Sequence, residues 1–176
     1  MPYKVILSFL IFIAPCICQA YEFYAKVISV RDGDTIEVSH RRRIKRIRLH
    51  GIDCPEINQH SGRHAKRFTS KLALGKKAKI IKKDIDKYGR IVAEVFLDNT
   101  SLNRELVKNG WAWHYVRYSS DEKLDELEKN ARQKKLGLWQ KENPLPPWEF
   151  RKQQREPLDY SAYFRKFVTK LRNFLK

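Results

Sequence analysis

Short runs of alternating apolar and polar residues predict strands in the first hundred residues. In a half-buried strand, successive side chains point to opposite faces, so an apolar residue recurs at every second position. Turn residues separate these runs, including an Arg-Asp-Gly-Asp segment and an Asp-Lys-Tyr-Gly segment. The pattern predicts five short strands, at residues 23–30, 35–39, 44–50, 77–83 and 90–97.

A different spacing, three to four residues, predicts helices between and after these strands. Ala65, Phe68 and Leu72 fall on one face of a helix that Gly75 ends. Ser101 is a candidate N-cap for a short helix at 102–109. Ser119 and Glu122 have the spacing of a capping box before a third helix, which carries Leu124, Leu127 and Ala131.

The order of these elements predicts an α+β fold. Five strands, with the first helix between the third and the fourth, are typical of a small OB-type Greek-key barrel with about three packed helices. A proline-rich break at 143–147 follows, and then a basic amphipathic helical extension. Its apolar face is predicted to hold Tyr160, Tyr163, Phe164, Phe167, Val168, Leu171, Phe174 and Leu175. We therefore divide the chain into a leader at 1–20, a domain at 21–142 and a linker with a tail at 143–176.

Composition narrows the class of protein. The chain has 176 residues, 37 of them Lys or Arg against 20 Asp or Glu, a net charge of +17, and 42% of it is hydrophobic. That apolar content excludes a disordered polyelectrolyte, and the absence of a sequence period excludes a repeat protein. Such a positive balance predicts an anionic partner. Nucleic acid is the usual one, and an anionic membrane surface is the competitor.

The first twenty residues resemble a signal peptide. Lys4 precedes an apolar stretch of about thirteen residues, shorter than the roughly twenty needed to span a bilayer. We expect cleavage near Ala20 and export, either secretion or release into a periplasm, and an uncleaved anchor is the alternative. After cleavage Cys54 would be the only thiol, so no intramolecular disulfide is expected.

Two acidic clusters lie where predicted strands meet loops. Asp32 and Asp34 belong to the segment 32–35, and Asp53 and Glu56 to the segment 51–56. If adjacent strand ends bring these oxygen ligands together, they suit calcium, and magnesium less well. Taken singly, each Asp-Gly pair also has the ordinary interpretation of a turn.

Two arginines favour a phosphate site beside these carboxylates. Arg48 leaves its predicted strand close to the 53–56 loop, and Arg90 opens another strand. Guanidinium groups bind phosphates bidentately and stabilise the charge of a transition state. A solvated strand position is the alternative for either arginine alone.

Together these segments resemble the thermonuclease (staphylococcal nuclease) family, over about residues 23–139. The resemblance rests on order and spacing, in the segments Asp-Gly-Asp-Thr at 32–35, Ile-Arg-Leu at 47–49, Gly-Ile-Asp-Cys-Pro-Glu at 51–56 and Asp-Lys-Tyr-Gly-Arg at 86–90. It implies a calcium-dependent nuclease that cleaves DNA and RNA with little sequence preference and leaves 3′-phosphates.

The resemblance also implies roles for individual residues. Asp34, Asp53 and the backbone carbonyl of Cys54 match the calcium ligands. Glu56 matches the general base that activates water. Arg48 and Arg90 match the two arginines that hold the scissile phosphate.

Further contacts to the substrate are implied less directly. Lys87 and Tyr88 match residues that contact the neighbouring phosphate. Tyr115 or Tyr118 is a candidate for stacking near the nucleotide, although this stretch departs from the pattern of the best-known member. Cys54 stands where that member has threonine, a change of little consequence if only the carbonyl binds the metal.

We therefore predict a secreted endonuclease acting on DNA or RNA as a monomer. The alternative is a non-catalytic OB-fold module that only binds nucleic acid. Since every candidate catalytic residue precedes the break at 143–147, we expect the tail to be separable from the chemistry, so that a protein without residues 148–176 still cleaves at low salt. The tail would pack on the domain or add phosphate contacts, and weak contact with an anionic membrane is the second interpretation.

Overall fold

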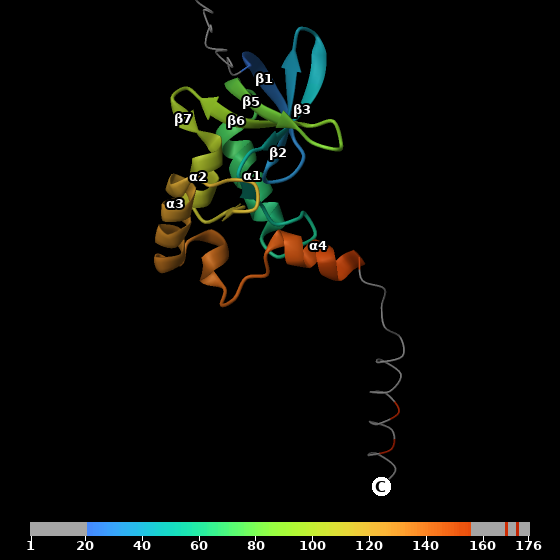
Figure 1. The fold of residues 1–176 in the computed structure, drawn as a ribbon, viewed down its shortest axis with the longest axis vertical. Helices are drawn as coiled ribbons and strands as arrows, with labels where there is room; N and C mark the ends of the chain where they lie inside the picture. The colour runs from blue at the N-terminus through green and yellow to red at the C-terminus, as the bar shows by residue number, and fades with distance from the viewer. Residues whose placement is uncertain (1–20, 156–167, 169–171, 173–176) are drawn as a thin grey trace, which may run out of the picture.

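The structure, a computed structural model, describes residues 21–155 together with Val168 and Arg172. The predicted leader, and most of the apolar face predicted for the tail, lie outside the described residues. Five strands form the centre of the domain (Figure 1): β1 (Glu22–Val30), β2 (Thr35–His40), β3 (Arg43–Leu49), β5 (Lys77–Ile85) and β6 (Ile91–Leu97).

These five strands close into a barrel. Neighbouring strands pair antiparallel in the order β3-β2-β1-β5-β6, and a parallel pairing of β3 with β6 joins the two ends. In that pairing Ile47 lies opposite Ile91 and Arg48 opposite Val92. Closure therefore places Arg48 beside the strand that follows Arg90. The predicted α+β OB-type barrel is confirmed.

Helices and short strands complete the domain. Figure 1 shows α2, α3 and α4 gathered toward the end of the molecule away from the β2–β3 hairpin. The remaining elements are α1 (Gly62–Ala73), α2 (Leu102–Lys108), α3 (Glu122–Gln133), the 3-10 helix η1 (Gly137–Gln140), α4 (Pro147–Arg155), β7 (Thr100–Ser101) and a separate pair of short strands, β4 (Ile52–Asp53) and β8 (Trp113–His114).

Alternation along the strands produces the main core. On β1, Phe23, Ala25 and Val27 are buried while Glu22 and Tyr24 are exposed. The buried faces of the barrel strands meet apolar residues of α1, α2 and the start of α3 in one cluster. Burial of apolar area on this scale is the dominant stabilising contribution to such a domain.

A second apolar cluster lies outside the barrel. Trp113, Ala131, Leu138 and Trp139 form it, and Trp148 of α4 packs against it. This cluster fastens α4 to the domain. Within the described part of the chain, no helix is both long and apolar enough to span a bilayer.

The structure shows which residues cap the N-termini of α2 and α3. Ser101 caps α2 as predicted, since its side chain accepts a hydrogen bond from the backbone N–H of Arg104. The capping box predicted for Ser119 and Glu122 is wrong. Asp121 is the N-cap of α3, and its carboxylate accepts from the backbone N–H of Lys123. Aspartate is as good an N-cap as serine, so spacing alone did not select between them.

Candidate active site

The two candidate metal aspartates share one arginine. Arg48 Nη1 lies 3.0 Å from Asp34 Oδ2, and Arg48 Nη2 lies 2.7 Å from Asp53 Oδ1. Nη1 also donates to the backbone carbonyls of Leu49 and Ile52. The strand ends therefore bring the two acidic clusters together, and the guanidinium is fixed by several acceptors at once.

Asp34 is the most perturbed carboxylate in this group. Burial raises the pKa of Asp34 to about 7, against the opposing effect of the Arg48 guanidinium. Burial, together with the nearby charge of Asp34, also raises the pKa of Asp53. A carboxylate removed from water favours its neutral form unless a cation compensates the charge. The site therefore holds two carboxylates, Asp34 and Asp53, that are removed from water.

Cys54 meets these oxygens through its backbone. Its backbone N–H donates to Asp34 Oδ2 at 2.6 Å. The thiol is buried, burial raises its pKa well above the ordinary value, and it packs where a Cβ on Gly33 would collide with it. Of the atoms of Cys54, the backbone is therefore what the site can use.

These residues fit a hard divalent cation. Asp34 and Asp53 are oxygen donors whose burial calls for positive charge, and oxygen donors are what Ca²⁺ prefers. Among the described residues, no group of three or more His, Cys, Asp and Glu side chains is placed to hold a metal. A cation here would take Asp34, Asp53 and a backbone carbonyl such as that of Cys54, and complete its shell with water or substrate oxygens.

Glu56 is positioned by a tight loop in front of α1. Its backbone N–H donates to Gln59 Oε1 at 3.2 Å, and its carbonyl accepts from the backbone N–H of Gln59 at 2.9 Å. Gln59 also donates from Nε2 to the carbonyl of Leu145, which ties this loop to the segment before α4. The Glu56 carboxylate is partly exposed, as a group that meets a substrate water must be.

Gly62 allows this loop to approach the helix. A Cβ on Gly62 would lie 1.8 Å from the backbone oxygen of Glu56, far inside van der Waals contact. We expect Gly62→Ala to displace the loop and to lower the free energy of unfolding by about 1–3 kcal/mol, which lowers the melting temperature. Nuclease activity should also fall in the fraction that stays folded. Thermal melts and cleavage assays measure the two effects. Gly75→Ala is a contrast with open space around the new methyl group, strained only by its positive φ of 80°. A Gly62→Ala protein as stable and active as wild type would contradict this account of the loop.

Arg90 reaches the same site from the end of the turn before β6. Its Nε lies 2.6 Å from Asp86 Oδ2, and its Nη1 lies 3.5 Å from the hydroxyl of Thr35, the residue after Asp34. Asp86 also accepts from the backbone N–H groups of Tyr88 and Arg90, and these bonds lower its pKa. The turn therefore holds Arg90 in one orientation.

The candidate substrate residues lie on two loops. Lys87 and Tyr88 are exposed on the β5–β6 turn, and the Lys87 ammonium and the Arg90 guanidinium both lie near the Tyr88 ring. Tyr118 is exposed, and its ring meets the edge of Tyr115 at 4.9 Å. Tyr115 stacks in parallel on Trp148 of α4, with centroids 5.1 Å apart and planes 4° apart. One face of Tyr115 is thus covered while α4 is docked.

The structure adds one residue that the sequence analysis did not single out. Arg151 of α4 lies with Nη2 2.7 Å from Asp53 Oδ2 and with Nη1 2.6 Å from Glu56 Oε1. The first part of the predicted tail, α4, therefore packs on the domain and also contacts the candidate site. One of many arginines in a basic tail carries no local signal. The only hint was the pair of aromatic residues nearby, Trp148 and Phe150, at the start of that tail.

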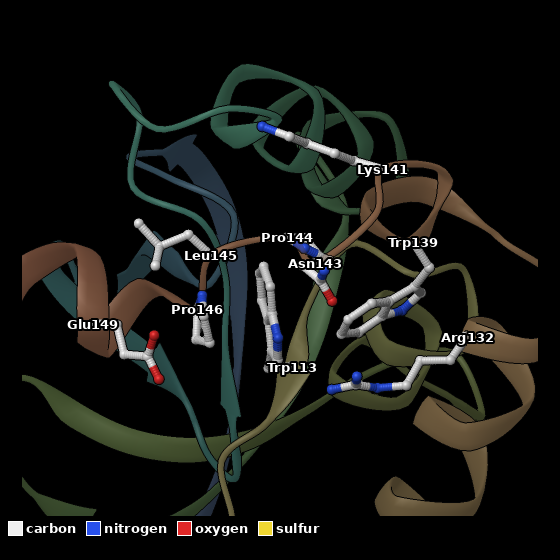
Figure 2. A pocket seen from close by; sticks show the side chains of 9 residues that line it. All are labelled: Trp113, Arg132, Trp139, Lys141, Asn143, Pro144, Leu145, Pro146 and Glu149. Carbon is white, nitrogen blue, oxygen red and sulfur yellow. The ribbon is translucent and has the colours of Figure 1, made fainter.

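A pocket of about 440 Å³ lies between the proline-rich segment before α4 and the two tryptophans Trp113 and Trp139. Figure 2 shows the rings of Trp113 and Trp139 standing between the proline-rich segment and Arg132 of α3. The guanidinium of Arg132 lies 3.8 Å from the centre of the Trp139 ring. None of the residues lining the pocket belongs to the network formed by Asp34, Arg48, Asp53 and Glu56. The pocket is therefore not the candidate active site.

Comparisons with known proteins show which family this chain resembles. Residues 46–141 match the family described as staphylococcal nuclease homologue. An Escherichia coli protein named "Uncharacterized endonuclease" is 40% identical over 142 residues, which cover 80% of this chain and 92% of that protein. A Haemophilus influenzae protein of the same name is 33% identical over 157 residues, or 88% of each chain. The Arabidopsis thaliana protein "Staphylococcal-like nuclease CAN1" is 41% identical over 110 residues, 62% of this chain and 34% of that one.

The chain belongs to the staphylococcal nuclease homologue family. Family membership makes it a nuclease, with nucleic acid as its substrate.

Proposed function

We propose that this nuclease is a calcium-dependent endonuclease that hydrolyses DNA and RNA with little sequence preference and leaves 3′-phosphates. The observation that carries the proposal is the single network that places the candidate residues together at one end of the barrel: Asp34, Arg48, Asp53, Glu56 and Arg90. The leader adds the proposal that the protein is exported after cleavage near Ala20.

The two arginines would hold the scissile phosphate. Arg48 is anchored by Asp34 and Asp53, and Arg90 by Asp86, before any substrate arrives. Donors that are fixed in advance stabilise charge that grows in a transition state without a cost of reorganisation. Arg48 and Arg90 would therefore orient the phosphate and compensate the charge added when water attacks phosphorus.

Glu56 would take a proton from the attacking water. The new P–O bond forms as the bond to the 5′ oxygen breaks, so the phosphate stays on the 3′ oxygen. The departing 5′ oxygen takes a proton from solvent water and becomes a hydroxyl, and Glu56 returns its proton to solvent. A carboxylate in hydrogen-bond reach of the water is suited to this step. Calcium, when bound by Asp34, Asp53 and a backbone carbonyl, would add positive charge next to the phosphate.

Weak sequence preference follows from the kind of contacts available. Lys87, Arg48 and Arg90 are suited to phosphate, and Tyr88 and Tyr118 are exposed rings on which any base can stack. Contacts to phosphate and to base faces carry little sequence information.

Digestion of a panel of nucleic acids tests the proposal. Purified full-length protein is incubated with single- and double-stranded DNA and RNA of mixed sequence in calcium, and the ends are then analysed. We expect internal cleavage of both DNA and RNA, with 3′-phosphate ends. Binding without cleavage would favour the non-catalytic module, and 5′-phosphate ends would contradict the proposed direction of attack.

Calcium binding tests the two aspartates separately from cleavage. Asp34→Asn removes one of two carboxylates, so we expect calcium affinity to fall by about tenfold or more, the effect of losing one strong charge-assisted contact. Isothermal titration without DNA measures it. Asp98→Asn, at an exposed turn with positive φ that asparagine also adopts, removes the same charge elsewhere. Equal calcium affinity in Asp34→Asn, Asp98→Asn and wild type would remove Asp34 from the metal site.

A further inference from the structure

Arg151 bridges a metal carboxylate and the general base of the proposed nuclease. Its guanidinium contacts Asp53 Oδ2 at 2.7 Å and Asp53 Oδ1 at 3.4 Å, and also Glu56 Oε1 at 2.6 Å. Asp53 is almost fully buried, whereas the Arg151 side chain is 31% exposed and the Glu56 side chain 35% exposed. The arginine therefore closes the outer side of the site while its head group reaches inward.

The position of the Arg151 guanidinium is set by the packing of α4 on the domain as well as by the conformation of its own side chain. Trp148, one turn before Arg151, stacks on Tyr115 and meets the edge of Trp113 at 6.4 Å. Pro147 is buried, and the carbonyl of Leu145 accepts a hydrogen bond from Gln59, in the loop of Glu56. These contacts connect α4 and the segment before it to the loop of Glu56 and to the loop of Tyr115.

The bridge has two chemical consequences. Arg48 and Arg151 together contact both oxygens of Asp53, so the oxygens that a divalent cation needs are already engaged. Arg151 also occupies Oε1 of Glu56, one of the two oxygens that could accept a proton from the attacking water. The two carboxylates raise the pKa of Arg151, which therefore stays charged and cannot leave by losing its proton.

We propose that α4 is an autoinhibitory strap, whose Arg151 competes with the divalent cation for Asp53 and holds Glu56 until the helix moves away. This inference rests on the proposed function, because it needs Asp53 as a metal ligand and Glu56 as the base. Removal of the strap uncovers both carboxylates and the covered face of Tyr115. Calcium displaces Arg151 by supplying positive charge at Asp53. The nucleic acid displaces α4 by competing for its contacts.

Calcium affinity without nucleic acid tests the strap directly. Titration calorimetry on the full-length protein compares wild type with Arg151→Gln, Arg151→Lys and Arg155→Gln. Loss of a charge-assisted contact at Asp53 should tighten calcium binding about tenfold in Arg151→Gln. Arg151→Lys keeps the charge without the planar fork and should fall between the two. Arg155 is exposed one turn further along α4, so Arg155→Gln removes the same charge and should bind calcium as wild type does.

A second variant separates the strap from the arginine itself. Trp148→Ala removes the stack on Tyr115 and leaves Arg151 in the chain, so it should also tighten calcium binding. Thermal melts confirm that each variant is folded. The calcium concentration that gives half-maximal cleavage should fall in parallel with the binding constant in Arg151→Gln.

The outcomes distinguish this inference from the proposed function. If wild type cleaves DNA with calcium but Arg151→Gln binds calcium no more tightly, the strap is overturned and the nuclease proposal stands. A loss of turnover in Arg151→Gln at saturating calcium, with no change in affinity, would also overturn the strap and make Arg151 a phosphate contact. Failure of wild type to bind calcium or to cleave in its presence would contradict the proposed function instead.

Discussion

Glu56→Gln is expected to lower the rate of cleavage by about 10²–10⁴-fold, the contribution of a positioned general base. Glutamine keeps the size and the hydrogen-bonding reach of the side chain but cannot accept the proton of the attacking water. Because Glu56 is not among the proposed calcium ligands, calcium and DNA should bind about as they do to wild type. The rate is measured in single-turnover cleavage at saturating DNA and calcium.

Controls separate the loss of the base from loss of the fold. Glu142→Gln makes the same chemical change at an exposed position between η1 and α4, and should cleave like wild type. Equal melting temperatures would show that the Glu56→Gln loop is intact. A folded Glu56→Gln protein that cleaves within about threefold of wild type would mean that a different residue is the base.

Arg90→Lys is expected to cost on the order of 10²–10³-fold in turnover, typical of losing one preorganised donor to the transition state. Lysine keeps the positive charge but has no planar fork, so it cannot hold Asp86 and a phosphate oxygen together. DNA binding should change far less than turnover, since the charge remains. Single-turnover rates and DNA titrations in calcium separate the two effects.

Arg43→Lys serves as the matched control for Arg90→Lys. Arg43 is exposed at the start of β3, on the β2–β3 hairpin, and its replacement should leave turnover unchanged. If Arg90→Lys were as active as Arg43→Lys, a point charge would be enough at this position and Arg90 would not act through bidentate geometry.

The barrel was predictable from the sequence because its physical signal is local. Alternation on β1 assigns Phe23, Ala25 and Val27 to one face, and the same period on β3 separates Ile47 and Leu49 from Arg48. Turn residues between the strands then leave few ways to connect them. The proximity of Asp34, Asp53 and Arg48 followed from strand ends that meet once the barrel closes.

What the sequence did not predict depends on contacts between distant segments. The stack of Trp148 on Tyr115 joins residues 33 positions apart, and the Arg151 bridge to Glu56 spans 95 positions. Neither has a period or a turn motif, so only packing in three dimensions selects Arg151 among the many basic residues of the tail. The short β4–β8 pair, which sets Asp53 opposite Trp113, is a non-local contact of the same kind.

The cleavage of plasmid DNA in calcium and in excess chelator shows whether the described site is a calcium-dependent nuclease centre. Purified wild-type protein is assayed in calcium, after addition of a chelator, and after calcium is restored. We expect rapid cleavage in calcium, loss of cleavage in the chelator and recovery when calcium is added back. Undiminished cleavage in excess chelator would contradict this expectation.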